Sequence, residues 1–156
     1  MVIRIVILLA IWGCFGALFP VRAQSGVEER EVVHLLERFF FALKDKDLPV
    51  LRDAFHPEAS LNTVLPAENG NYSTLGIYSV GDFLERISLS KEFLEEKLTS
   101  VDVRVDGHMA TAWAPYDFFV NGDFHHCGVN AFQFIYGKEG WKITHVMDTR
   151  RKEGCK

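Results

Sequence analysis

Two side chains in the last third of the sequence have the chemistry of an acid–base pair. Asp117 and His126 flank Asn121-Gly122, a dipeptide typical of a two-residue β-hairpin turn. If the ladder is regular, these two residues lie directly opposite each other, with Cβ atoms about 5 Å apart. A carboxylate that orients an imidazole makes a general base near neutral pH. The alternative is an ordinary cross-strand polar pair at the end of a sheet, and the sequence leaves both interpretations open.

The same register, continued into the next hairpin, predicts a ligand pocket. It places Trp113, Asn130, Phe132 and His145 together on a bulky, aromatic face of the sheet. Apolar walls with a few polar groups are the usual composition of a small-molecule site. We therefore predict that these four residues line a pocket for an apolar small molecule. For His145 the alternative is a core histidine whose ring is satisfied by a neighbouring side chain.

The opposite face of the same strands predicts a surface for a partner. Alanines alternate along residues 110–114, and Tyr116 and Phe118 continue this flatter face. Such a face is too apolar to lie comfortably in water, so we expect a homodimer to form through the strand from Ala110 to Phe118. The helices are then expected to cover the bulky face.

The run His125-His126-Cys127 is not expected to bind a metal. Successive strand residues point to opposite faces, and no second spaced pair supplies the remaining ligands of a tetrahedral site. The chain has three cysteines. A tail that turns back after Arg151 brings Cys155 to Cys127, and we favour a disulfide between them over two free thiols.

The N-terminus has the pattern of a secretory signal peptide. Arg4 precedes an apolar run from Ile5 to Phe19, and Val21-Arg22-Ala23 forms a small-residue cleavage site. We expect residues 1–23 to be removed and residues 24–156 to form one domain, periplasmic or secreted and free of the membrane after cleavage. A lipid anchor at Cys14 is the less favoured alternative. Export places the remaining two cysteines where disulfides persist.

Charge excludes some partners. The net charge of the whole chain is -4, and no basic run interrupts its acidic character. Nucleic acid is therefore not an expected partner. No motif calls for a cofactor, and none is expected.

The remaining elements predict an α+β domain. Apolar residues recur every three or four positions from Val27 to Lys44, and a shorter helix follows the N-cap Asp47. A hairpin over 59–65 and 72–78 comes next, then a helix that begins at Ser79 or Gly81. Alternating strands follow over 97–106 and 109–120, and the two hairpins described above complete a four-stranded meander.

This order, together with three short stretches, resembles the nuclear transport factor 2-like superfamily. The stretches are HPEA at 56–59, GWKI at 140–143 and DTRR at 148–151. More narrowly, residues 113–134 and 148–155 resemble exported bacterial SnoaL-like proteins of no settled activity. The resemblance implies a cone-shaped curved antiparallel sheet with three helices on its concave face, a pocket at the open end and frequent dimers through the sheet.

The resemblance does not imply one activity, because the superfamily holds isomerases, dehydratases, cyclases and binding or assembly domains. The leading hypothesis is an exported protein that binds a small molecule. The alternatives are a cofactor-free isomerase, dehydratase or cyclase that uses Asp117 and His126, and a structural module that assembles through the 110–118 strand.

Overall fold

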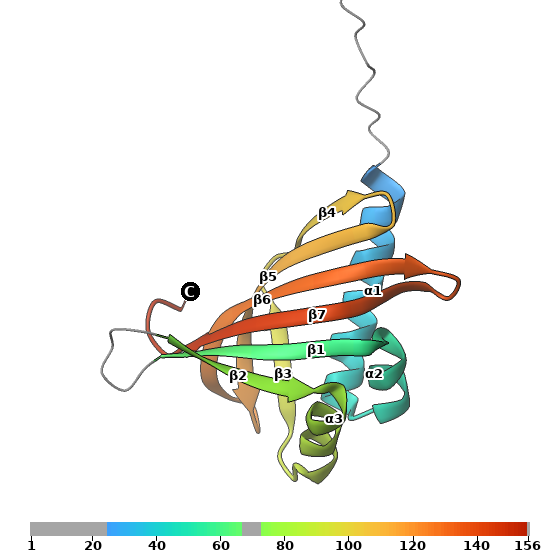
Figure 1. Cartoon of the computed structure of the whole chain (residues 1–156). Coiled ribbons are helices and arrows are strands. Elements are labelled where there is room, and N and C mark those ends of the chain that lie inside the picture. Colours follow the sequence, from blue (N-terminus) through green and yellow to red (C-terminus); the bar gives the residue numbers. More distant parts are fainter. Residues whose placement is uncertain (1–24, 67–72, 156) are drawn as a thin grey trace, which may run out of the picture.

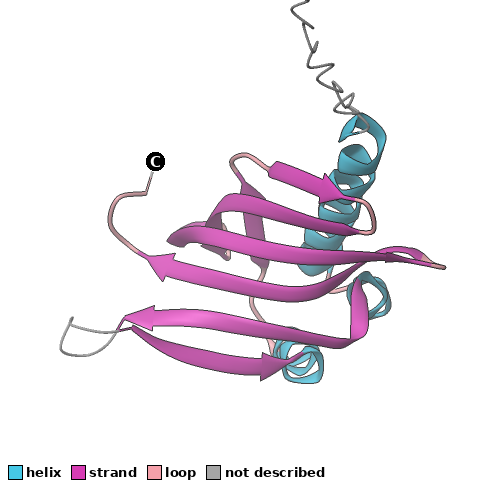
Figure 2. Cartoon of the chain, turned by 45° about the horizontal axis from the view of Figure 1, so that its top comes forward, coloured by secondary structure: helices cyan, strands magenta, loops and turns pink. Residues whose placement is uncertain are grey.

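The computed structural model describes residues 25–66 and 73–155, so the predicted signal peptide and Cys14 lie outside the described residues. Within them three helices pack on one side of a curved, unclosed sheet of seven strands (Figures 1 and 2). The elements are α1 (Ser25–Asp45), α2 (Leu48–Ala54), β1 (Phe55–Pro66), β2 (Ser73–Ser79), α3 (Val80–Leu89), β3 (Leu94–Leu98), β4 (Asp102–Asp106), β5 (Met109–Val120), β6 (Asp123–Gly137) and β7 (Gly140–Arg151). The predicted α+β class is confirmed.

Side-chain caps begin the two shorter helices. Asp47 caps α2 by accepting a hydrogen bond from the backbone N–H of Val50 at 3.2 Å. Ser79 begins α3 in a capping box, because its hydroxyl accepts from the Asp82 N–H and the Asp82 carboxylate accepts from the Ser79 N–H. Both starting positions agree with the sequence pattern. No helix among the described residues is long and apolar enough to span a membrane.

The sheet is mixed, with strand order β2-β1-β7-β6-β5-β3, and β4 also pairs with β5. The β1–β7 pair is parallel, and the other pairs are antiparallel. Many residues separate β1 from β7, so no hairpin turn sets their relative direction, and the expectation of a purely antiparallel sheet was wrong for this pair. The strand expected over 97–106 is two strands, β3 and β4, which pair with different halves of β5.

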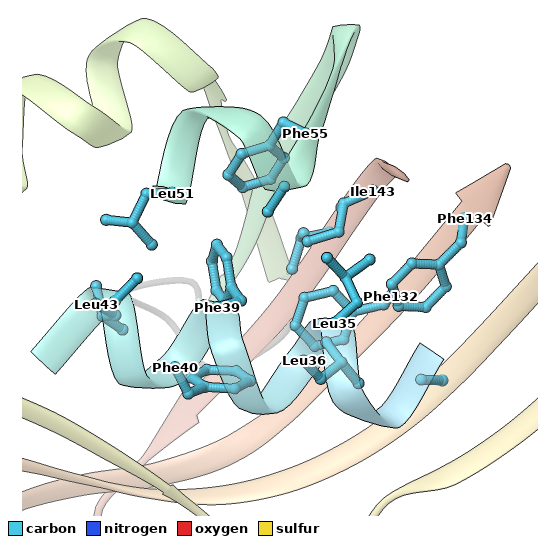
Figure 3. Packing of buried hydrophobic residues seen from close by; sticks show 14 of the residues in the cluster. Leu35, Leu36, Phe39, Phe40, Leu43, Leu51, Phe55, Phe132, Phe134 and Ile143 are labelled. Atoms are coloured by element: carbon cyan, nitrogen blue, oxygen red, sulfur yellow. The ribbon is translucent and has the colours of Figure 1, made fainter. Parts of the chain in front are cut away.

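The core lies between α1 and the concave face, which is the face of the sheet toward the helices. Phe39 of α1 packs edge-on against Phe55 and Phe132, with ring centroids 5.5 and 6.4 Å apart (Figure 3). Ala110, Ala112 and Ala114 are buried in the same core. Their small side chains leave room for the aromatic rings, so the prediction that this strand face forms a partner surface was wrong.

A β-bulge changes the register between β5 and β6. Next to the turn, Phe119 pairs with Phe124, but Phe118 pairs with His126, so His125 is an extra residue in β6. Beyond that point every predicted pair is displaced by one. Asp117 pairs with Cys127 instead of His126, and Trp113 pairs with Ala131 instead of Asn130. A turn fixes the register only as far as the first bulge.

A second bulge lies between β6 and β7. Gln133 pairs with His145 and Phe134 with Ile143, so Thr144 is an extra residue in β7. Phe132 consequently pairs with Val146 instead of His145. The bulge leaves Ile143 and Val146 buried in the core and turns His145 to the convex face, the face away from the helices.

A disulfide joins Cys127 of β6 to Cys155 in the C-terminal tail, with Cα atoms 5.8 Å apart. Cys127 points to the convex side and is only 3% exposed. The bridge holds the tail beside the end of β7, and its β6 cysteine lies between His126 and Gly128 in the sequence.

Replacing Cys155 with Ser should lower the free energy of unfolding by about 3 kcal/mol, because the bridge closes a loop between residues 28 apart in sequence. Urea unfolding of the variant and the wild type measures the difference. Reduced wild type is the control, and it should unfold at the midpoint of the variant. Equal midpoints for the oxidised wild type and the variant would show that the bridge contributes nothing.

Candidate functional site

A cavity of about 250 Å³ lies between α1, α3 and the concave face. Its apolar walls come from both helices and from the sheet: Phe39, Phe40, Leu43, Leu61, Phe83, Phe118, Phe132 and Val146. Polar side chains from five strands also line it, and we call the following seven the polar cluster: Thr63, Glu96, Tyr116, His126, Asn130, Asp148 and Arg150.

Strand alternation, counted from the bulges, brings the polar cluster to the concave face. Tyr116 pairs with Gly128, and Asn130 pairs with Asp148 on the next strand. Two residues beyond Asp148, Arg150 points the same way and also lines the cavity. Glu96 reaches the cavity from β3, where it stands between Leu94 and Leu98.

Glu96 is a carboxyl group in a mostly apolar environment. Its Oε1 accepts a hydrogen bond from the Asn130 amide at 2.5 Å, and no partner for Oε2 is found among the described residues. Burial raises the pKa of Glu96 to about 7; the Asn130 bond opposes this rise, and the negative charge of Asp148 adds to it. Near neutral pH the group therefore exists both as a proton donor and as a proton acceptor.

Asp148 is fully engaged by its neighbours. The hydroxyl of Thr63 donates to its Oδ1 at 2.6 Å, and Arg150 Nε donates to its Oδ2 at 2.8 Å. The Asp148 side chain is 13% exposed, whereas that of Arg150 is 54% exposed. In this ion pair the Asp148 carboxylate is therefore largely buried, whereas the Arg150 guanidinium is accessible to solvent.

Tyr116 and two histidines form a continuous polar contact. Tyr116 donates to the Thr149 carbonyl at 3.0 Å, and its oxygen lies 3.2 Å from His126 Nε2. His126 Nδ1 in turn lies 2.8 Å from His125 Nδ1. Burial, and then the charges of Arg150 and His125, lower the pKa of His126 to about 4, so its ring is neutral at neutral pH. Burial raises the pKa of Tyr116 well above its ordinary value.

The absence of a side chain at Gly128 leaves space for the Tyr116 ring. A Cβ atom at residue 128 would lie 1.9 Å from the Thr149 carbonyl oxygen and 2.8 Å from the Tyr116 hydroxyl oxygen. The Tyr116 ring therefore lies across the place where a side chain of β6 would stand. Only glycine at 128 allows this close approach.

The structure brings together only part of the predicted site. Asn130 and Phe132 line the cavity, and so does His126. Trp113 and His145 lie on the convex face, where Trp113 is 57% exposed and His145 Nδ1 lies 2.9 Å from the Ser60 hydroxyl oxygen. The predicted pocket of four residues is therefore divided between the two faces of the sheet by the bulges.

Asp117 also lies on the other face from His126, so the predicted acid–base pair is not formed. His125 and His126 both line the cavity, because the extra residue at His125 interrupts the alternation expected for this run. Within residues 25–66 and 73–155, no cluster of three or more His, Cys, Asp or Glu side chains is arranged to hold a metal ion.

Sequence reasoning missed Glu96, Tyr116, Asp148 and Arg150 as members of one site. The signal for Glu96 was present, because an acid at a spacing of two from Leu94 and Leu98 occupies an inward position of a strand. Tyr116 was assigned to the flatter face, and no sequence pattern marked the bulges that bring Tyr116, Asp148 and Arg150 to one cavity.

Comparisons with known proteins show which fold this arrangement has. No family model matches the chain, and no curated protein matches it significantly. Solved structures do match. An NTF2-like protein with a cystatin-like fold from Novosphingobium aromaticivorans is 18% identical, with a TM-score of 0.64 over 82% of this chain and 84% of that one.

Two other neighbours are similar to the same extent. A protein of unknown function from Mycobacterium tuberculosis has a TM-score of 0.65 at 14% identity, covering 87% of this chain and 78% of its own. A proposed dehydratase of the NTF2-like family from Streptomyces avermitilis has a TM-score of 0.60 at 20% identity, covering 78% and 94%. The chain therefore has the nuclear transport factor 2-like, cystatin-like fold that the resemblance implied.

As the pH rises, the Glu96→Gln variant should become more stable in comparison with the wild type. The folded-state pKa is about 7 and the unfolded value about 4.5, so the wild type loses stability as the pH rises through this window, while the variant does not. The difference in free energy of unfolding should grow by about 3 kcal/mol between pH 4.5 and pH 8. Urea unfolding at four pH values measures it. A constant difference would contradict the raised pKa.

Proposed function

We propose that the protein is exported and binds one small, largely apolar molecule in the cavity between α1, α3 and the concave face. The observation that carries this proposal is a cavity of about 250 Å³ whose walls are aromatic and aliphatic and whose remaining lining is the polar cluster. A few convergent polar groups in an apolar cavity fix the orientation of a ligand.

The dimensions and lining of the cavity limit the ligand. Pockets for drug-sized molecules are about 300–1,000 Å³, so this one suits a molecule of one or two rings. Phe39, Phe40 and Phe132 offer ring faces and edges to its apolar part. Glu96 Oε2 offers a hydrogen-bonding atom to its polar part, as a donor or an acceptor according to its protonation.

Export is supported by the sequence of residues 1–23 and by the disulfide between Cys127 and Cys155, since such bridges persist in oxidising compartments. Mass spectrometry of the protein from a periplasmic or culture fraction checks this, with a chain expected to begin at Gln24. A chain that retains residues 1–23 in the cytoplasm would contradict it.

A naphthalene-sized neutral probe tests ligand binding. We expect 2-naphthamide to bind wild-type protein in calorimetric titration, and we expect Leu61→Trp to abolish binding because the larger side chain fills the cavity. Trp113→Ala is the matched control, since Trp113 lies on the convex face and should leave the affinity within twofold. Thermal unfolding verifies that both variants fold. If neither this amide nor the acid of the same shape, 2-naphthoate, binds to wild type, or if Leu61→Trp leaves binding unchanged, the proposal is overturned.

The homodimer is a further part of the proposal, and it now involves the convex face. Ile77, Met147 and Trp113 are 73%, 36% and 57% exposed there, and they lie on one row across the strands, with Asn62 between Ile77 and Met147 and Ala131 between Met147 and Trp113. An apolar surface of this kind favours association.

Trp113→Glu should shift the protein to monomer, because it replaces the largest apolar side chain of this row with a charge. Sedimentation equilibrium of the variant and the wild type measures the change. Thr111→Glu, next along the same face of β5, is the control for added charge and should weaken the dimer less. A wild-type protein that is monomeric at all concentrations tested would exclude the dimer.

A second candidate function is proton-transfer catalysis without a cofactor, and the pKa of Glu96 near 7 favours it. An acid whose pKa matches the working pH is effective both as a base and as an acid. Glu96 replaces the Asp117–His126 pair in this role, because Asp117 does not reach the cavity. The similarity to a proposed dehydratase is compatible with such chemistry.

Deuterium exchange tests this candidate. We expect wild-type protein to accelerate exchange at the α-carbon of 2-tetralone in D2O, as Glu96 removes a proton from carbon and returns a deuteron. Glu96→Gln should reduce the rate at least about tenfold, because general-base catalysis contributes a factor of this size or more. Asp117→Asn, an equally conservative change on the other face, should have no effect. Proton NMR follows the loss of the α-CH signal, and an active Glu96→Gln variant would exclude the role.

A further inference from the structure

The cations that line the cavity outnumber the carboxylates able to neutralise them. Arg150 comes from β7 and Arg86 from α3, and both line the cavity. The Arg86 guanidinium stacks over the Tyr78 ring at 4.4 Å. Asp82, one turn earlier in α3, acts on it electrostatically but does not line the cavity, and no carboxylate in the described parts of the chain lies within ion-pair distance of it. In a chain with a net charge of -4, this local excess of positive charge runs against the composition.

The acids of the cavity do not cancel this charge. Asp148 already accepts from Thr63 and Arg150, so both of its oxygens are engaged. Glu96 is bonded to the neutral Asn130 amide and is only partly ionised near neutral pH. One full negative charge, that of Asp148, therefore stands against two arginines.

Arg150 has donors left for a ligand. Its guanidinium group carries five N–H donors. One donates to Asp148 at 2.8 Å, and a second lies 3.5 Å from the Thr63 hydroxyl oxygen, which leaves three. The side chain is 54% exposed although it lines the cavity, so these donors are accessible to an entering molecule. A planar guanidinium with free donors matches the geometry of a carboxylate.

The neighbours of Arg150 also suit an anion. His126 and His125 line the cavity with ring nitrogens 2.8 Å apart, and Lys152 lies near enough to act electrostatically on His126. None of these three side chains carries negative charge, and both histidines gain a favourable partner if an anion enters. A cationic ligand would be repelled by Arg150 and Lys152.

We propose that the ligand is an organic acid whose apolar ring or short chain lies against Phe39, Phe40 and Phe132 and whose carboxylate binds Arg150 beside His126. This inference rests on the proposed ligand-binding function, and it names the chemical class of the ligand. The apolar walls select the body of the molecule, and Arg150 selects its anionic end.

Two probes of the same shape separate this inference from the binding proposal itself. Calorimetric titration with 2-naphthoate and 2-naphthamide compares a carboxylate with its neutral amide. We expect the naphthoate to bind at least about tenfold more tightly, because a charge-assisted hydrogen bond to arginine is lost in the amide. Added salt should weaken naphthoate binding and leave naphthamide binding unchanged.

Arg150→Gln should remove the preference for the naphthoate, while Arg151→Gln should retain it. The two substitutions remove the same charge from adjacent residues, but Arg151 pairs with Cys127 on the convex side, whereas Arg150 lines the cavity. Since Arg150→Gln leaves Asp148 without its partner, Lys152→Gln is the second variant. It should weaken naphthoate binding two- to threefold without affecting naphthamide.

The outcomes distinguish failure of the ligand-binding proposal from failure of the organic-acid inference. If neither probe binds, the ligand-binding function is wrong and the inference fails with it. If the amide binds as tightly as the acid, or Arg151→Gln is as harmful as Arg150→Gln, only the organic-acid inference is overturned. If Arg150→Gln does not fold, the acid-to-amide ratio, its salt dependence and Lys152→Gln still decide.

Discussion

One extra residue at His125 determines which side chains of β6 face the helices. Without it, the ladder that begins at the Asn121-Gly122 turn would direct the opposite set of β6 residues inward, because side chains alternate along a strand. The bulge places His126, Asn130 and Phe132 beneath α1, and the second bulge at Thr144 then brings Val146 and Asp148 into line with them. The cavity therefore depends on two local irregularities, each of which realigns a whole strand.

Packing on α1 explains why this register is stable. Ala110, Ala112 and Ala114 of β5 lie opposite Phe134, Phe132 and Asn130, so small side chains alternate with large ones across the concave face. The large rings of β6 fill the space under α1, and the alanines allow the helix to come close. A register shifted by one residue would bury the other set of β6 side chains, among them Gln133, and expose Phe132 and Phe134 to solvent.

Hydrogen bonds and an ion pair among its members offset the free-energy cost of burying the polar cluster. Isolated charges in such a place would be strongly unfavourable, but Asp148 is satisfied by Thr63 and Arg150, and Tyr116 donates to a backbone carbonyl. Glu96 and His126 lack a charged partner, and burial shifts both of their pKa values toward the neutral form. The cluster thus keeps hydrogen-bonding atoms inside an apolar cavity at limited energetic cost.

The sequence by itself determined most of the elements, although it did not divide β3 from β4. Periodicity located α1, capping residues began α2 and α3, turn dipeptides located the hairpins, and the meander of β5, β6 and β7 follows from local pattern. Even Glu96 had a signal, since its spacing from Leu94 and Leu98 follows strand alternation. Tertiary structure decided which of the candidate residues come together in the site. A bulge inserts one residue into a strand and has no clear sequence signal. It nevertheless reverses which residues face inward along the rest of that strand. For that reason Trp113, His145 and Asp117 lie on the convex face, whereas Tyr116, Asp148 and Arg150 line the cavity.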